Sequence, residues 1–129
     1  MEPDQYECVV PVPLYKVRRR ERGFNQSELL AAAILEAFPN ARLEAGLERV
    51  RPTHVQSRIT DPALRRRNVL GAFAVSQPER FAGRTVLLVD DVVTSGSTVE
   101  ECCKVLQAAG ARAVDVLAVA IPVNRENAE

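Results

Sequence analysis

Residues 86–98, with the sequence VLLVDDVVTSGST, decide the fold class of this chain. Residues 86–89 are four consecutive apolar side chains, a pattern typical of a strand buried on both faces of a parallel sheet. Asp90 and Asp91 follow directly, so we expect them at the carboxyl end of that strand. Open α/β sheets bind ligands at this edge, where two carboxylates could accept hydrogen bonds from adjacent hydroxyl groups or help to hold a hard cation.

A phosphate-binding loop is predicted directly after the two aspartates. Its residues are Thr94, Ser95, Gly96, Ser97 and Thr98. Gly96 and its small neighbours allow backbone N–H groups to converge on an anion, and the hydroxyl groups add donors. Ser97 with Glu100, or Thr98 with Glu101, makes a capping box that starts a helix. Carboxylates for a sugar beside amides for a phosphate predict a sugar-phosphate site; the alternative is an ordinary loop with two exposed aspartates.

The rest of the chain alternates between strand and helix patterns. Strands are predicted at residues 6–12, 43–50, 69–75, 86–89 and 113–121, and helices beginning at Asn25 or Ser27 and at Ser97 or Thr98. Residues 53–68 are too polar for a core element and predict a mobile loop, with one helical turn at most at 62–67. We therefore expect one α/β domain over residues 1–129, with a mostly parallel sheet and a frayed tail at 124–129.

Composition excludes several classes of protein. Basic and acidic residues balance at 17 each, so no overall positive field favours nucleic acid. Because no apolar stretch approaches the roughly 20 residues that span a bilayer, and no signal peptide opens the sequence, we expect a cytoplasmic protein without membrane insertion. Arginines do cluster locally, at Arg18, Arg19, Arg20 and Arg22 and again at Arg65, Arg66 and Arg67. Such clusters suit a pyrophosphate, a nucleic-acid backbone or a solvated surface.

The three cysteines, Cys8, Cys102 and Cys103, have no C-x-x-C spacing. Neither a disulfide framework nor a complete zinc site within this chain is expected from that pattern. We predict that all three thiols serve in packing, Cys8 at the first strand and the other two in the helix after the phosphate loop.

Residues 86–98 resemble the phosphoribosyl pyrophosphate (PRPP) motif of type I phosphoribosyltransferases, a hydrophobic strand leading into two acidic residues and a T-x-G-x-T-like loop. Residues 9–33 and 51–73 resemble the ComF/GntX group, whose members are also similar to glutamine-dependent amidophosphoribosyltransferases. The resemblance implies the type I phosphoribosyltransferase-like, Rossmann-like fold. Because the sequence begins shortly before the first predicted strand, we expect the transferase-like domain without the group's N-terminal zinc module.

The resemblance also implies residue roles. Asp90 and Asp91 would bind the ribose hydroxyls of PRPP and hold Mg²⁺, in part through water, and the five loop residues would hold the 5′-phosphate. The pyrophosphate loop falls at Leu14, Tyr15 and Lys16, where the sequence departs from the Asp-Ser-Gly of the amidotransferases. Arg65, Arg66 and Arg67 fall in a basic loop that closes over the pyrophosphate.

Three functions stay open on the sequence alone. The first is a phosphoribosyltransferase, a glycosyltransferase that acts on PRPP, releases pyrophosphate and uses an unidentified acceptor. The second is a regulatory module that binds PRPP or a nucleotide without turnover, because residues 122–124 offer no base-recognition hood. The third is a competence protein that works with other competence proteins on single-stranded DNA through its arginine clusters. The acceptor and the oligomeric state are not determined by these residues.

Overall fold

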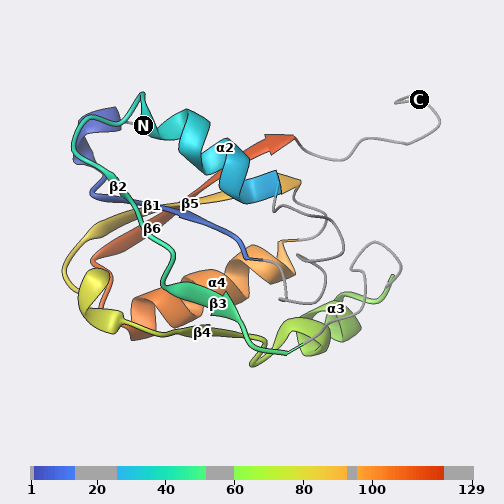
Figure 1. Cartoon of the computed structure of the whole chain (residues 1–129). Coiled ribbons are helices and arrows are strands. Elements are labelled where there is room, and N and C mark those ends of the chain that lie inside the picture. The colour runs from blue at the N-terminus through green and yellow to red at the C-terminus, as the bar shows by residue number, and fades with distance from the viewer. Residues whose placement is uncertain (1, 14–25, 52–59, 93–95, 121–129) are drawn as a thin grey trace.

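Figure 1 shows the computed structural model of the chain, which describes residues 2–13, 26–51, 60–92 and 96–120. In chain order its elements are η1 (Pro3–Gln5), β1 (Cys8–Pro11), α2 (Gln26–Leu35), β2 (Arg42–Leu43), β3 (Leu47–Arg49), α3 (Pro62–Val69), β4 (Phe73–Val75), η3 (Pro78–Arg80), β5 (Thr85–Val92), α4 (Ser97–Ala108) and β6 (Ala113–Ala120). The order alternates strand and helix, which confirms the α/β class predicted from the sequence.

The main sheet has four strands in the order β2-β1-β5-β6, and every neighbouring pair is parallel. Val10 lies opposite Leu88 and Leu88 lies opposite Val116, so the central strand β5 is paired on both sides. The strand β5, helix α4 and strand β6 form the βαβ unit that the sequence predicts. Strands β3 and β4 pair antiparallel in a separate two-stranded sheet.

Side chains of β1 and β5 alternate between two apolar cores, because successive strand residues point to opposite faces of a sheet. The core on the α4 side receives Cys8, Val10, Val12, Val86 and Leu88, and the core on the α2 side receives Val9, Leu87 and Val89. Figure 1 shows α2 on one side of the sheet and α4 on the other. The uninterrupted apolar run of β5 is therefore explained by burial on both faces.

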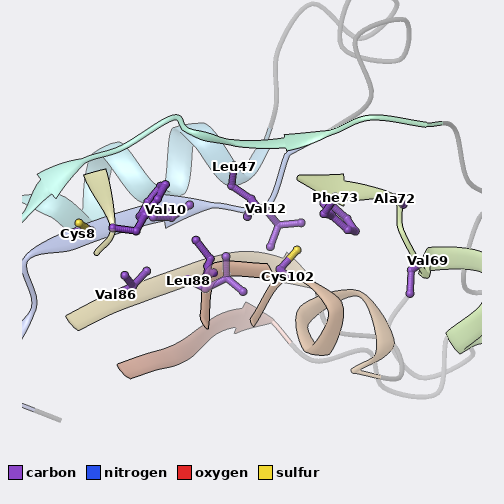
Figure 2. Packing of buried hydrophobic residues seen from close by; sticks show 12 residues of the cluster. Cys8, Val10, Val12, Leu47, Val69, Ala72, Phe73, Val86, Leu88 and Cys102 are labelled. Atoms are coloured by element: carbon purple, nitrogen blue, oxygen red, sulfur yellow. The ribbon is translucent and has the colours of Figure 1, made fainter. Parts of the chain in front are cut away.

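The core on the α4 side also contains the small sheet. Figure 2 shows Leu47 and Phe73 of that sheet packed near Val12 and Cys102. On the opposite side, Ala31 of α2 is fully buried, as expected for a helix that packs on the sheet, and the rings of Tyr6 and Phe38 meet edge to face at 5.7 Å between centroids. Each face of the sheet thus carries its own covering layer.

The single strand expected over residues 43–50 is wrong. The chain leaves the main sheet after β2 and enters the small sheet at β3, and Glu44 lies between the two strands. Glu44 is only 4% exposed, and its carboxylate accepts a hydrogen bond from Arg80 at 3.1 Å. A buried carboxylate needs such a partner, so the Glu44–Arg80 pair accounts for the position where the chain changes sheets.

The strand expected over residues 69–75 is confirmed only at Phe73–Val75, because Val69 ends a helix instead. That helix, α3, has eight residues and is longer than the single helical turn expected at 62–67 within the loop predicted at 53–68, whereas residues 53–59 lie outside the described part of the chain. Asp61 caps α3 by accepting a hydrogen bond from the Ala63 N–H at 2.9 Å, and Pro62 occupies its first turn. These two residues are a strong helix start that outweighs the polar composition.

None of the helices in the described ranges is both long enough and apolar enough to cross a membrane. At the carboxyl edge of the main sheet, Pro11 at the end of β1 lies opposite Val89, and β5 continues beyond it to Val92.

Candidate functional site at the carboxyl edge of the sheet

Asp90 lies at the carboxyl edge of the main sheet, where the sequence predicts it. Strand β5 continues through Asp90 and Asp91 and ends at Val92. The Val12 N–H donates to the Val89 carbonyl at 2.9 Å, which holds the end of β1 beside this part of β5. Asp90 is only 8% exposed, so its carboxylate is largely removed from water. A buried carboxylate at the ligand-binding edge of an open α/β sheet is suited to accept hydrogen bonds from a bound polar molecule.

The helix α4 begins at the same edge. Its N-cap is Gly96, whose φ of +87° is in the left-handed region that glycine adopts most readily. Ser97 is 8% exposed and Thr98 is half-buried. The first backbone N–H groups of a helix have no acceptor within the helix, so they and the helix dipole favour an anion here.

The capping box predicted for α4 is wrong. Because Gly96 makes the turn into the helix, Ser97 and Thr98 already belong to the first turn and neither is the N-cap. Glu101 has a different role: its Oε2 accepts a hydrogen bond from the Gly71 N–H at 3.2 Å. Glu101 is 8% exposed, and this bond ties the second turn of α4 to the chain that leaves α3.

Helix α3 brings the predicted arginine cluster next to α4. Arg65 is half-buried, whereas Arg66 and Arg67 are exposed. Arg51 holds the end of this helix, because its guanidinium donates to the Leu70 carbonyl at 2.6 Å and to the Arg67 carbonyl at 3.4 Å. A groove of about 350 Å³ separates the two helices; it is lined by Ala63, Arg66, Arg67, Val69, Leu70, Ser97, Glu100, Glu101 and Lys104. The groove therefore connects the basic helix to the start of α4.

Cys102 lies in the α4-side core beneath this edge and is fully buried. Burial raises the pKa of the Cys102 thiol far above its ordinary value; the charge of Arg49 acts to lower it, and those of Asp90 and Glu101 to raise it. Burial also raises the pKa values of Cys8 and Cys103. All three cysteines are free thiols, which fits the packing role predicted for them.

Two residues near the site were not assigned a site role from the sequence. Glu101 was assigned only to a cap, because S-x-x-E and T-x-x-E both match the capping signature. Arg49 lies near the end of the strand predicted at 43–50, and its guanidinium carbon lies 4.8 Å from the centroid of the Phe73 ring. No sequence signal identifies it, because the direction in which its side chain faces follows from the pairing of β3 with β4.

Several predicted site residues lie outside the part of the chain that the structure describes. These are Leu14, Tyr15 and Lys16 of the expected pyrophosphate loop, Thr94 and Ser95 of the phosphate loop, and the arginines at 18, 19, 20 and 22. For Asp91 the structure describes the backbone in β5. The structure therefore places these predicted site residues: Asp90, Gly96, Ser97, Thr98 and the arginines of α3.

An open parallel sheet with a carboxylate and a helix N-terminus at its carboxyl edge is the arrangement in which many α/β proteins bind their ligands. Comparison with known proteins is more specific. The family described as "Phosphoribosyl transferase domain" matches residues 17–128. The chain is 39% identical over 116 residues to Competence protein F of Haemophilus influenzae, covering 88% of this chain and 50% of that protein. It is 40% identical over 108 residues to the DNA utilization protein YhgH of Escherichia coli K12, covering 84% and 46%.

The chain therefore belongs to the phosphoribosyl transferase domain family and is a ComF-like member of it. It spans about half the length of the curated relatives that it matches. Among solved structures, the glutamine PRPP amidotransferase of Bacillus subtilis, complexed with ADP and GMP, is similar with a TM-score of 0.55. The similarity covers 91% of this chain and 23% of that one at 23% sequence identity, which shows the type I phosphoribosyltransferase fold.

The donor chemistry of the edge fits Mg²⁺, the ion that the family generally uses together with PRPP. Within the described residues there is no group of three or more His, Cys, Asp or Glu side chains that could hold a metal ion. Mg²⁺ is commonly bound by one or two carboxylates together with substrate phosphates and water. Asp90 supplies a hard oxygen donor of the required kind at the place where a phosphate-bearing ligand would lie.

Proposed function

We propose that this chain binds PRPP with Mg²⁺ at the carboxyl edge of its sheet and transfers the phosphoribosyl group with release of pyrophosphate. One observation carries the proposal. The buried carboxylate of Asp90 and the left-handed turn at Gly96 lie at the same edge, at the two ends of a five-residue connection, in a chain of the phosphoribosyl transferase domain family. The carboxylate of Asp90 suits the ribose hydroxyls, and the N–H groups that follow the turn at Gly96 suit a phosphate.

Each part of the ligand has a proposed set of binding residues. The carboxylates of Asp90 and Asp91 accept hydrogen bonds from the 2′- and 3′-hydroxyls and hold Mg²⁺, directly or through water. The N–H groups at the start of α4 bind the 5′-phosphate with the hydroxyl groups of the loop. That loop set is Thr94, Ser95, Gly96, Ser97 and Thr98, and the proposed pyrophosphate set is Leu14, Tyr15, Lys16, Arg65, Arg66 and Arg67.

In the proposed reaction, the bond between ribose C1 and pyrophosphate breaks and the pair of electrons leaves with pyrophosphate. A nucleophile then forms a bond to C1 from the opposite face of the ring. The carboxylates orient the ribose and stabilise positive charge that develops near C1. Arginine side chains stabilise the departing anion. When bound, Mg²⁺ would neutralise negative charge on the pyrophosphate oxygens.

A binding module without turnover uses the same site and differs only in the lack of an acceptor. Pyrophosphate release distinguishes the two forms of the proposal. We expect the release of pyrophosphate from PRPP to depend on Mg²⁺ and on an added acceptor. Amines, nucleobases and ammonia are the acceptors to screen. PRPP binding without release in the presence of any of these acceptors would favour the regulatory form.

A second candidate function, binding of single-stranded DNA, is favoured by the groove between α3 and α4. Three of its lining residues are cationic, Arg66, Arg67 and Lys104, and two relatives are named for competence and DNA utilization. The aspartates at the sheet edge take no part in this function. DNA binding that falls steeply with salt and is unchanged by Asp90→Asn would therefore support it, whereas dependence on Mg²⁺ and PRPP supports the first proposal.

The experiment that separates these candidates is a ligand-dependent thermal unfolding series on the whole chain. The added ligands are PRPP with and without Mg²⁺, ribose 5-phosphate, and a short single-stranded oligonucleotide. A ligand that binds the folded protein raises the melting temperature by mass action. We expect PRPP with Mg²⁺ to give the largest rise, and a rise with the oligonucleotide alone would contradict the PRPP proposal.

A further inference from the structure

Arg49 interrupts the apolar face of strand β3. Leu47 is 3% exposed and belongs to the α4-side core, Glu48 is exposed, and Arg49 is half-buried. Since strand residues alternate between two faces, Arg49 points to the same side as Leu47, toward the core. Arginine is seldom placed on the core-facing side of a strand, and breaks in a hydrophobic pattern are most often found at functional sites.

The guanidinium of Arg49 is held in place by Phe73. The two residues lie directly opposite each other in the β3–β4 register, and the guanidinium carbon is 4.8 Å from the centre of the Phe73 ring. Phe73 is 3% exposed, so the ring itself is fixed within the core. Contact of a cation with an aromatic face offsets part of the cost of removing the charge from water. The stacked arrangement therefore presents a charged group whose position is set before any ligand binds.

This fixed charge lies at the same edge as Asp90. Figure 2 shows Phe73 on the side of Val12, near Cys102, and away from Cys8 and Val86 at the start of the parallel strands. Phe73 and Cys102 belong to the same buried core cluster. The register of β3 with β4 and the contact with Phe73 thus place Arg49 on this side of the core.

The edge has the electrostatic requirements of a phosphate site. Asp90 and Glu101 are buried carboxylates, and an anionic ligand approaching them needs a fixed cation as well as the N-terminus of α4. The guanidinium of arginine is planar and presents paired N–H donors that match two oxygens of one phosphate group. Because its position is already fixed by Phe73, Arg49 would lose little conformational freedom when it binds such a group.

We propose that Arg49 is a ligand-binding residue of this edge, where its guanidinium donates paired hydrogen bonds to a phosphate group of the bound ligand. This inference rests on the proposed function, which supplies a ligand with phosphate groups at both ends. The phosphate that Arg49 contacts is either the 5′-phosphate or the pyrophosphate, and these have the same chemistry of recognition. Ribose 5-phosphate and inorganic pyrophosphate separate the two.

The test is a calorimetric titration of PRPP, ribose 5-phosphate and pyrophosphate, each with Mg²⁺, into wild type and Arg49→Met. Methionine keeps an unbranched apolar stem over the Phe73 ring and removes the paired donors. We expect the dissociation constant for PRPP to rise by about tenfold or more, as for the loss of a charge-assisted hydrogen bond. The dissociation constant should rise by the same factor for only one of the two smaller ligands, ribose 5-phosphate or pyrophosphate. That ligand is the one whose phosphate Arg49 contacts.

Three further variants complete the design. Arg42→Met is the matched control, because Arg42 is exposed in β2 and lies opposite Cys8, at the start of β1 and away from the carboxyl edge; its binding should equal that of wild type. Arg49→Lys keeps the charge without the planar fork and should recover part of the affinity. Phe73→Leu removes the aromatic support and should weaken PRPP binding several-fold, while thermal unfolding confirms that each variant is folded.

The results separate this inference from the proposed function. If wild type binds PRPP and Arg49→Met binds all three ligands equally well, Arg49 is not a ligand-binding residue and the proposed function stands. Equal losses in Arg49→Met and Arg42→Met would also overturn the inference, since the effect would then be one of overall charge. If Arg49→Met does not fold, unchanged binding by both Arg49→Lys and Phe73→Leu overturns it. Wild type that binds none of the ligands overturns both proposals.

Discussion

At the scale of single residues, the carboxyl edge of the sheet differs from the rest of the interior in its chemistry. Most buried side chains are apolar, but Asp90, Ser97 and Glu101 are each only 8% exposed where β5 and α4 meet this edge. Polar groups in such positions are costly unless they have partners or serve a ligand. Glu101 accepts a hydrogen bond from the Gly71 N–H, and Asp90 and Ser97 belong to the proposed ligand site.

Gly96 provides a test of the turn that begins α4. Its φ is +87°, and an added Cβ would meet no atom of the described structure within 4 Å, so a substitution affects backbone strain without steric crowding. Gly96→Ala should destabilise the protein by about 1 kcal/mol, since a left-handed conformation is unfavourable for alanine. Urea unfolding measures this cost. Ligand binding measured on the same variant should weaken if this turn presents the N–H groups to the 5′-phosphate.

Glu101 provides a second test at this scale. Glu101→Leu removes the acceptor of the Gly71 N–H and should lower the free energy of unfolding by about 1 kcal/mol, because a partly buried hydrogen bond to a charged group is lost. Glu101→Gln keeps an oxygen acceptor and should unfold close to wild type. Glu100→Gln, at the neighbouring exposed position, is the control. Equal stability of Glu101→Leu and wild type in urea would show that the bond contributes nothing.

The buried thiol of Cys102 predicts a dependence of stability on pH. Burial raises its pKa in the folded state above that of the unfolded chain, so folding favours the protonated thiol. Stability is therefore fully present below the unfolded thiol pKa of about 8.5 and falls as the pH rises above it. Urea unfolding between pH 7 and pH 10 should show this fall, and Cys102→Ala should reduce it. An identical fall in that variant would assign the effect to Tyr6 and the other cysteines, whose pKa values are also raised.

At the scale of elements, the sequence predicts those parts that depend on local pattern. The strand β5, the helix α4 and the strand β6 are found where the apolar runs predict them, because strong patterns determine these elements. The pairing of β3 with β4 depends on tertiary contacts, so the expected strand at 43–50 did not reveal the change of sheet. A strand of three residues does not by itself show which face carries the Arg49 side chain, so this could not be predicted without knowledge of the pairing.

Helix α3 shows the opposite error. The polar composition predicts a loop with one helical turn at most, whereas Asp61 and Pro62 start a full helix and Val69, 2% exposed, fixes its end in the α4-side core. A charged helix of this kind is stabilised by one buried residue and by hydrogen bonds at its ends rather than by a broad apolar face. Composition alone does not reveal such contacts, because they come from Arg51 and Glu101 elsewhere in the chain.

The arginines of α3 give a prediction for DNA binding. If single-stranded DNA lies along the groove between α3 and α4, replacing Arg66 and Arg67 with glutamine removes two phosphate contacts. The slope of log affinity against log salt should then become less steep by about 1.4, at about 0.7 per contact for single strands. Filter binding or fluorescence anisotropy at several salt concentrations gives this slope. An unchanged slope would show that the DNA does not occupy this groove.

At the scale of the whole molecule, two apolar cores on either side of a parallel sheet hold the site at one edge. The balanced overall charge means that positive charge is local, at Arg49 and along α3. The aspartates and the glycine turn could be predicted from sequence because they are adjacent in the chain. Arg49 and the groove could not, because residues 24 to 41 positions apart come together only through the pairing of β3 with β4 and the packing of α3 on α4.

The central claim, that Asp90 and Asp91 bind the ribose of PRPP with Mg²⁺, is tested most directly by calorimetric titration of PRPP into wild type and the Asp90→Asn, Asp91→Asn double variant. Asp4→Asn, at an exposed position in η1, is the control. We predict that wild type and the control both bind PRPP and that this binding requires Mg²⁺. The affinity of the double variant for PRPP should be lower by about a hundredfold or more, because two charged acceptors that also hold the ion are removed together. Equal affinity of wild type and the double variant would contradict the account.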